Sequence, residues 1–249
     1  MKYLAEKIRT ANDHGFSLME MMVAMAITSI VFAGIYTAYR SQVGSYVGQE
    51  DVVEMQQNVR NAMYYMQRSV RMSGFDPQRT GLIGFVTNFP APFHTLGATS
   101  DSNNIAFTSD DSANGDLTDD PDSELIAYRL NANQLQKLAF IAGPLPGTWL
   151  PGWETVAENI DALDFVYLDG DDPPNVLAPP LTAAALADIR SVQITIVARA
   201  GQNPSPLAAN ITDNTVYTNQ LGTVIFNPAG DNFRRIILTA QANCRNLSL

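Results

Sequence analysis

An uncharged apolar run near the start of the chain restricts its fold more than any other feature. Residues 21–39 carry no charge, and as an α-helix they would extend about 28 Å, close to the hydrocarbon thickness of a bilayer. Lys2, Lys7 and Arg9 precede the run, whereas Arg40 is the only basic residue for some distance after it. The positive-inside rule therefore predicts a single-pass segment with its N-terminus in the cytoplasm and the remaining chain exported.

Two ordinary explanations of this run are a cleavable secretory signal and a plain N-terminal anchor. Ala24-Met25-Ala26 offers a small-residue cleavage site, but the apolar run continues beyond it. A plain anchor leaves Glu20 unexplained, because a carboxylate inside hydrocarbon costs a few kcal/mol and no Lys or Arg lies within a helical turn of it. Cleavage between Gly15 and Phe16 would create the missing partner, a Phe16 α-amine that is mostly cationic.

These residues match a known signal. The stretch Gly15-Phe16-Ser17-Leu18-Met19-Glu20, between a short charged leader and the apolar run, closely resembles the class III prepilin signal of type IV pilins and type II secretion pseudopilins. The resemblance implies that prepilin peptidase cuts after Gly15 and N-methylates Phe16. It also implies that Glu20 pairs with the N-terminal amine of a neighbouring subunit in a filament.

Apolar residues continue at helical spacing beyond Arg40 and predict an amphipathic extension of the same helix. They are Val52, Met55, Val59, Met63, Met66 and Val70. Gly74 and Asp76-Pro77 supply a stop, and no proline interrupts residues 16–74, although Gly34, Gly44 and Gly48 are places where the helix could bend.

Short segments in which apolar and polar residues alternate follow residue 77, and this pattern predicts strands. The expected strands are residues 82–86, 104–108, 124–130, 134–141, 162–168, 189–199 and 233–244, with a hairpin across Asn131-Ala132-Asn133. The apolar faces of the last two should pack on the helix at residues 52–70. The predicted fold class is therefore α+β, with a long N-terminal helix on a mainly antiparallel sheet.

Several later stretches also have a family resemblance. "NIAFTSDDSANGDL", "ENIDALDFVYLDGDD", "RSVQITIVARA" and "RRIILTAQANCRNLSL" are similar, in order and placement, to the body of PilW-type minor pilins and the related J-type minor pseudopilins. The resemblance divides the chain into a leader (1–15), a membrane and filament-core helix (16–40), an amphipathic continuation (41–76) and a β-rich head (77–249).

The composition excludes some functions. A net charge of -10 without a basic cluster argues against nucleic-acid binding. Cys244 is the only cysteine, so no intramolecular disulfide forms, and its position on an apolar strand face favours a buried thiol over an intermolecular disulfide. With two histidines and no nucleophile or phosphate-loop motif, the chain is not expected to be an enzyme, and no catalytic residue is assigned.

Two acidic stretches raise the question of calcium. The first spans residues 109–123 and the second holds Asp169, Asp171 and Asp172. The first begins like an EF-hand loop at Asp110, but Pro121 stands where a bidentate Glu is required, so we expect solvated turns, no metal site and no cofactor, with an irregular calcium site as the alternative. Trp149 and Trp153 flank Pro151-Gly152, where a core lid is favoured over a partner contact.

The resemblance implies a minor pilin that takes part in filament assembly and initiation, at the tip. Its implied partners are prepilin peptidase, other major and minor pilins, the inner-membrane assembly platform and, before assembly, membrane lipid. It would begin in the cytoplasmic membrane and end in a filament in the periplasm or at the cell surface. The alternatives are a J-type minor pseudopilin of a type II secretion system and, from another class, a membrane-anchored module that binds calcium or another ligand.

Overall fold

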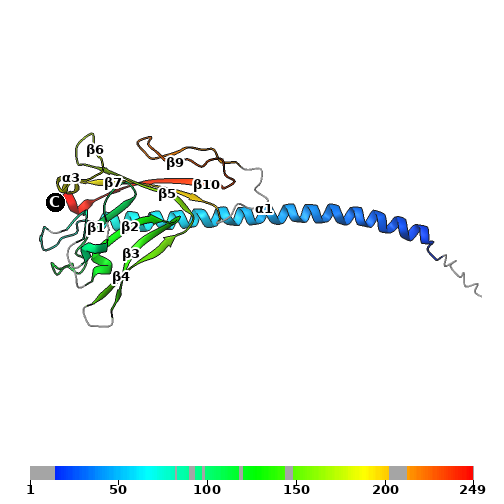
Figure 1. The fold of residues 1–249 in the computed structure, drawn as a ribbon, viewed down its shortest axis with the longest axis horizontal. Coiled ribbons are helices and arrows are strands. Elements are labelled where there is room, and N and C mark those ends of the chain that lie inside the picture. Colours follow the sequence, from blue (N-terminus) through cyan, green and yellow to red (C-terminus); the bar gives the residue numbers. More distant parts are fainter. Residues whose placement is uncertain are drawn as a thin grey trace, which may run out of the picture. The chain divides into compact units, whose positions relative to one another are not determined.

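One long helix begins the folded chain. The computed structural model describes residues 15–81, 83–89, 93–96, 99–117, 120–143, 148–201 and 212–248, so residues 1–14 of the expected leader lie outside it. Helix α1 (Leu18–Met72) has 55 residues and continues through Gly34, Gly44 and Gly48, which confirms the single helix predicted from the absence of proline (Figure 1). It ends just before Gly74, which takes the left-handed conformation (φ +74°) and donates its N–H to Thr108.

The chain forms two compact units that divide between Tyr46 and Val47. The described part of the first unit is Gly15 to Ser17 and the start of α1, and every large apolar side chain there, from Phe16 to Tyr39, is exposed. Helix α1 is also the one helix of the described residues that is long and apolar enough to cross a membrane, with a mean hydropathy of 2.0 over its most apolar window. This surface therefore has no cover within the described chain.

The second unit contains two four-stranded antiparallel sheets (Figure 1). The first has the order β1 (Asn104–Thr108), β2 (Leu125–Asn131), β3 (Gln134–Ala142), β4 (Trp149–Ala157). The second has the order β10 (Arg235–Asn243), β7 (Ser191–Arg199), β5 (Ile160–Leu168), β6 (Val176–Leu177). The smaller elements are a β8 (Tyr217–Thr218) and β9 (Val224–Phe226) pair, the helices α2 (Pro121–Glu124) and α3 (Ala183–Asp188), and two 3-10 turns, η1 (Phe93–Leu96) and η2 (Arg245–Ser248).

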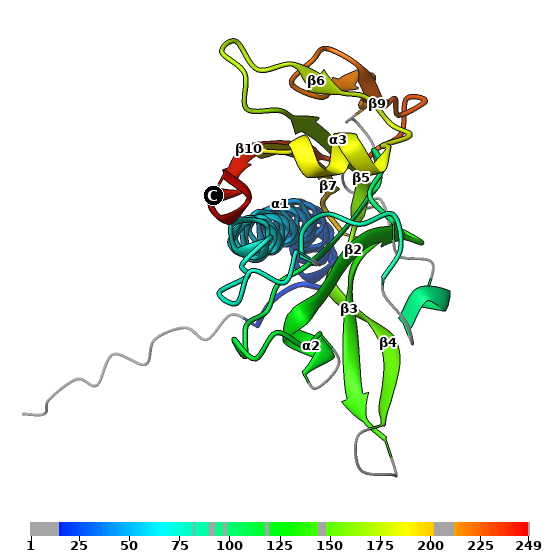
Figure 2. The same ribbon diagram turned by 90° about the vertical axis from the view of Figure 1, so that its left-hand side faces the viewer.

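The main core joins the second half of α1 to both sheets. Figure 2 shows β10 and β7 on one side of this helix and β2 and β3 on another. Met55, Val59, Met63, Met66 and Val70 are all buried there, which confirms the helix face read from the sequence. Alternate residues of β7 and β10 point into the same core, as their period-two pattern predicts. The opposite face of the first sheet carries a second cluster around Leu138 and Phe140.

Most strand predictions agree with the structure, and the exceptions have local causes. The β2–β3 hairpin turns at Ala132 and Asn133, both with positive φ as a two-residue primed turn requires. The strand expected at 82–86 is wrong over the described residues 83–86, where only an isolated bridge between Phe85 and Phe107 forms, and Leu82 lies outside them. Strand β4 was not predicted, because Pro151-Gly152 reads as a turn.

Candidate functional site

The prepilin-like motif forms the N-terminal cap of α1. The Ser17 backbone N–H donates to Glu20 Oε2 at 2.8 Å, and the Glu20 backbone N–H donates to Ser17 Oγ at 3.1 Å. This reciprocal pair is a capping box, and it satisfies two N–H groups that have no partner inside the helix. Glu20 therefore already has one partner on its own chain, although no basic group among the described residues accompanies that hydrogen bond.

The residues on either side of the expected cut are open to solvent. Phe16 is 86% exposed, and a Cβ built on Gly15 would meet no atom within 4 Å. The glycine is therefore not needed for packing within the described chain, in contrast to Gly74, where a Cβ would lie 2.2 Å from Leu247 Cδ2. A requirement for glycine at position 15 would have to come from another molecule.

Polar side chains in the apolar half of α1 are satisfied within the helix. The hydroxyls of Thr28, Ser29 and Thr37 donate to the carbonyls of Ala24, Met25 and Ala33, at 2.7 to 2.8 Å. Hydroxyl groups bonded in this way can enter hydrocarbon or a helix bundle without leaving a donor unpaired.

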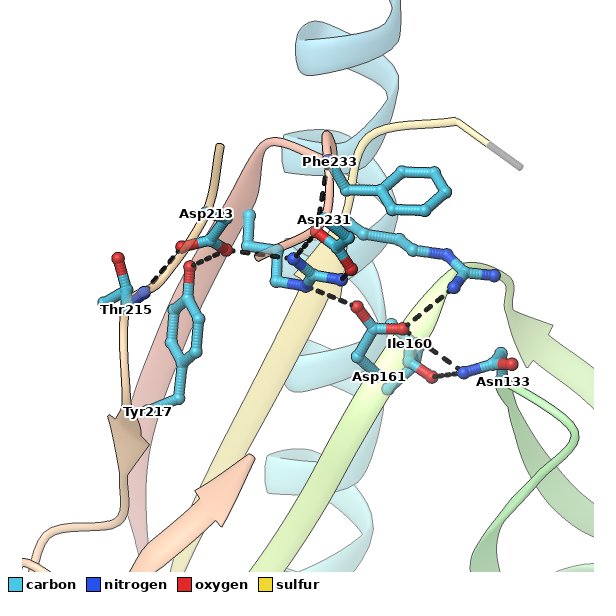
Figure 3. A network of polar contacts seen from close by, with 10 residues as sticks. Asn133, Ile160, Asp161, Asp213, Thr215, Tyr217, Asp231 and Phe233 are labelled. Atoms are coloured by element: carbon cyan, nitrogen blue, oxygen red, sulfur yellow. Dashed lines mark hydrogen bonds and ion pairs between the residues drawn. The ribbon is translucent and has the colours of Figure 1, made fainter. Parts of the chain in front are cut away.

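A cluster of charged residues lies in the head, around Arg235 at the start of β10 (Figure 3). The Arg235 side chain is 1% exposed and contacts three carboxylates: Asp161 at 2.6 Å, Asp213 at 2.9 Å and Asp231. Arg199 reaches the other oxygen of Asp161 at 3.2 Å. The cluster fastens residues 213 and 231, which are 18 positions apart in sequence, to the ends of β5 and β10.

The electrostatics of the cluster favour the charged forms of Arg235, Asp213 and Asp231. Burial alone would lower the pKa of Arg235, but the hydrogen-bonded carboxylates outweigh it and raise that pKa. The Arg235 hydrogen bond lowers the pKa of Asp231. Burial works in the opposite direction at Asp213, yet hydrogen bonds from Thr215 and Arg235 leave its pKa lowered. Burial and then the hydrogen bond to Asp213 raise the pKa of Tyr217 to about 12.

The acidic stretches are internally hydrogen-bonded. The expectation of a solvated turn is wrong for Asp110, which is fully buried and accepts the backbone N–H groups of Asn114 and Gly115. Asp169 is partly exposed and accepts N–H groups from Asp171 and Asn175, as a turn does. Asp119 lies outside the described residues. Within the described ranges, no three acidic, His or Cys side chains are placed to hold a metal ion.

The remaining singled-out residues are structural. Cys244 is buried, as predicted, and burial raises the pKa of its thiol to about 11. Trp149 and Trp153 lie in β4 and pack against the second cluster, and the Arg129 guanidinium stacks 3.9 Å from the centre of the Trp153 ring. The core-lid interpretation agrees with this packing.

Two features escaped the sequence reading for different reasons. The capping box is a local pattern, Ser17-x-x-Glu20, and this spacing marks helix starts, so the sequence alone is enough to predict it. The Arg235 cluster joins residues up to 74 positions apart, and no local spacing predicts which Arg and Asp will meet. Only the tertiary fold brings these residues together.

Comparisons with known proteins place the chain in a family. Residues 49–217 match the model of the family described as prepilin peptidase-dependent protein B, and residues 10–36 match the prokaryotic N-terminal methylation motif. A type IV-like pilin from Thermus thermophilus has a similar structure, with a TM-score of 0.46 and 13% identity over 78% of this chain and 98% of that one. No curated protein matches the chain.

The two matches cover the N-terminal signal and most of the head, and the family they define depends on prepilin peptidase, which is therefore a partner of the chain. The signal and the apolar helix together indicate a membrane-anchored protein. Pilins are in general structural subunits and not enzymes. The chain belongs to the prepilin peptidase-dependent protein B family and is a type IV pilin-like protein.

Proposed function

We propose that this protein is a minor pilin that takes part in assembly and initiation of a type IV filament, at its tip. In this proposal prepilin peptidase cuts between Gly15 and Phe16 and N-methylates Phe16. The cytoplasmic N-terminal leader is removed, and residues 16–40 move from lipid into the filament core. The other partners are major and minor pilins and the inner-membrane assembly platform.

The observation that carries the proposal is the uncovered apolar surface of α1. From Phe16 to Tyr39 the large side chains are exposed on all sides of the helix, and Glu20 is the only charged residue among them. Such a surface is stable in lipid, and outside lipid it requires other apolar helices around it. A bundle formed by the same helix of neighbouring subunits supplies that cover.

Glu20 would serve two purposes in this bundle. Its Oε2 accepts the Ser17 N–H within the chain, which caps the helix but leaves the negative charge unneutralised. The Phe16 amine of an adjacent subunit would neutralise this charge, and methylation would preserve the positive charge of that amine. Since Glu20 and the Phe16 amine both lie at the same end of their helices, their pairing would also fix the axial register of neighbouring helices.

The placement at the tip is inferred from the size of the head. Residues 77–249 follow the helix and contain both four-stranded sheets, which is a large body to stack in a dense helical array. A subunit used in few copies at the end of a filament has neighbours on one side only. The large head is therefore compatible with initiation and with a tip location.

Three substitutions test the proposal with separate readouts for processing and assembly. Gly15→Val should block the cut, seen by mass spectrometry of the N-terminal peptide, without altering the fold, because nothing packs against Gly15. Glu20→Gln keeps an acceptor for the Ser17 N–H but removes the charge, whereas Glu20→Ala removes both. We expect both Glu20 variants to be cut and methylated and both to be lost from sheared filaments.

The Gln variant discriminates between the two uses of Glu20. If Glu20→Gln enters filaments at the wild-type level while Glu20→Ala does not, helix capping is sufficient and the charge pair is refuted. If Gly15→Val is processed normally, the assigned cleavage site is wrong. Circular dichroism of each purified variant in detergent provides the control for folding.

A further inference from the structure

The second half of α1 has one face that neither sheet covers. The residues that pack into the main core repeat every three or four positions, and the residues between them are exposed to solvent. Arg60, Tyr64, Arg68 and Arg71 follow one another at spacings of four, four and three positions, so they lie along this exposed face. At 1.5 Å per residue, the distance along the helix from Arg60 to Arg71 is about 16 Å.

This face is basic in an acidic protein. From Met55 to Phe75 the chain contains three arginines and no aspartate or glutamate, although the whole sequence has a net charge of -10. No ion pair or hydrogen bond joins the guanidinium groups of Arg60, Arg68 and Arg71 to another residue that the structure describes. Arg68 and Arg71 are three positions apart, where like charges on a helix repel each other.

A groove of about 610 Å³ lies over the end of this face. Its floor is formed by residues 64–72 of α1, and its walls come from α2, the start of β2 and the C-terminal turn η2. Figure 2 shows η2 beside the end of α1. Asn246 of η2 fixes this wall, because its side-chain N–H groups donate to the carbonyls of Arg71 at 3.5 Å and Met72 at 3.4 Å.

The lining of the groove combines positive charge with exposed aromatic rings. Its charged residues within the described chain are Arg68, Arg71, Arg245 and Asp111, so cations exceed anions. Tyr64 is 61% exposed and Tyr65 is 57% exposed, and their rings meet edge to face with centroids 6.0 Å apart. Arginine, tyrosine and methionine are residue types that protein interfaces favour, and Met72 completes this set on the floor.

The size of the groove and the spacing of its charges distinguish between kinds of anion. An inorganic ion would fill a small part of the volume and would leave the tyrosine rings in water. It also could not reach Arg60, which lies about 12 Å along the helix from Arg68. A polypeptide segment that carries several carboxylates and an apolar side chain matches the charges, the rings and the length of the face together.

We propose that this arginine–tyrosine groove docks an acidic segment of a different protein chain. Its carboxylates pair with Arg68 and Arg71, and its apolar side chain lies against Tyr64 and Tyr65. A second copy is disfavoured, because a symmetric contact through this face would set arginine against arginine, and two chains of net charge -10 repel each other. The inference is drawn from the head alone and does not rest on the proposed role in a type IV filament.

The first test measures binding of a defined acidic peptide to the full chain in nonionic detergent. The probe is a capped Glu-Asp-Phe-Asp-Leu-Glu peptide with a neutral fluorophore, and its control peptide has Gln and Asn in place of Glu and Asp. Fluorescence anisotropy should show saturable binding of the acidic probe that weakens as salt is added. The neutral control peptide should not saturate.

Charge reversal at the groove supplies the second test. Arg68→Glu with Arg71→Glu should weaken binding of the acidic probe by about tenfold or more, and this variant should instead bind a probe with Lys in place of Glu and Asp. The matched control is Arg79→Glu with Arg234→Glu, which makes the same change in net charge at exposed positions outside the groove and should leave the affinity unchanged. Circular dichroism of both variants checks that they fold.

A third variant separates docking from simple charge attraction. Tyr64→Ala with Tyr65→Ala leaves every charge in place but removes both exposed rings, so the acidic probe should bind several-fold more weakly. An affinity unchanged in this variant would mean that the rings take no part, and the proposed contact with an apolar side chain would be wrong.

Four further outcomes would overturn the proposal. Two are an absence of saturable binding to the wild-type chain and equal weakening in the Arg68 and Arg71 variant and in its matched control. The third is displacement of the probe by inorganic phosphate as effectively as by unlabelled peptide, because the groove would then take a small anion. The last is self-association that rises with protein concentration and is lost in the Arg68 and Arg71 variant, because a second copy would then be the occupant.

Discussion

Arg235 is the residue whose removal should destabilise the head most. Its guanidinium is 1% exposed and lies between Asp161, which is 2% exposed, Asp213, which is 7% exposed, and Asp231. Replacement by Met retains much of the side-chain volume but leaves carboxylates without their cation. Removing one partner of a buried ion pair costs about 3–5 kcal/mol, mostly because the remaining charge is desolvated.

The melting temperature gives a direct measure of this loss. For a domain of this size, the melting temperature falls by about 2–4 °C for each kcal/mol of unfolding free energy that is lost, so Arg235→Met should lower the melting temperature by roughly 6–20 °C. Tryptophan fluorescence during urea or thermal unfolding of the full chain in detergent reports the transition, because Trp149 and Trp153 both lie in β4.

Arg199→Met is the matched control. Arg199 makes one ion pair with Asp161 and is 21% exposed, so its loss should cost about 1 kcal/mol or less. The double variant Arg235→Met with Asp213→Asn should be less destabilised than Arg235→Met with wild-type Asp213, because Arg235 is the ion-pair partner of Asp213 among the described residues and the charge that its loss strands is removed as well. Equal stability of the two single Arg variants would refute the view that Arg235 is the central cation of the cluster.

Three further results follow from the same structure. Because burial raises the pKa of Cys244 to about 11, its thiol should be unreactive to Ellman's reagent at neutral pH and react once urea unfolds the head; fast native reaction would contradict this. The Arg235 hydrogen bond lowers the pKa of Asp231, so the ionised Asp231 should stabilise the fold above its unfolded pKa of about 3.9, and this contribution should be lost as the pH falls below that value. Asp231→Asn should lose less stability on acidification than the wild type. Burial and then the hydrogen bond to Asp213 raise the pKa of Tyr217 to about 12, so its contribution to stability should be complete below the unfolded pKa of about 10 and be lost as the pH rises toward 12. Tyr217→Phe should therefore lose less stability at alkaline pH, and the same alkaline unfolding in wild type and variant would contradict this.

The N-terminal helix and the motif at its start could be predicted in detail because their determinants are local. Helix α1, its buried face from Met55 to Val70 and its end before Gly74 all follow from spacing and from the absence of proline. The Gly15 to Glu20 motif is contiguous, so a single short stretch carries the whole candidate site. The capping box between Ser17 and Glu20 is equally local, and its spacing alone would have sufficed to predict it.

The strands of the head could be predicted only where apolar and polar residues alternate regularly along the sequence. Strands β5, β7 and β10 have period-two apolar faces and were predicted within a few residues, whereas β4 was missed because Pro151-Gly152 resembles a turn. In the fold, Pro151 occupies an outward-facing position of an edge strand, where no ladder hydrogen bond is lost. Whether a strand lies at an edge is a property of sheet order, which the strand's own sequence does not contain.

The amino-acid sequence by itself determined the parts governed by near neighbours: the apolar helix, the processing motif and the alternation of the longer strands. Tertiary structure alone decided the pairings between distant segments, such as Arg235 with Asp161 and Asp213, the burial of Asp110, and the position of β10 at the edge of its sheet. The reason is that helix and strand periodicity depend on residues a few positions apart. Ion pairs and sheet edges depend instead on which remote segments the whole fold places side by side.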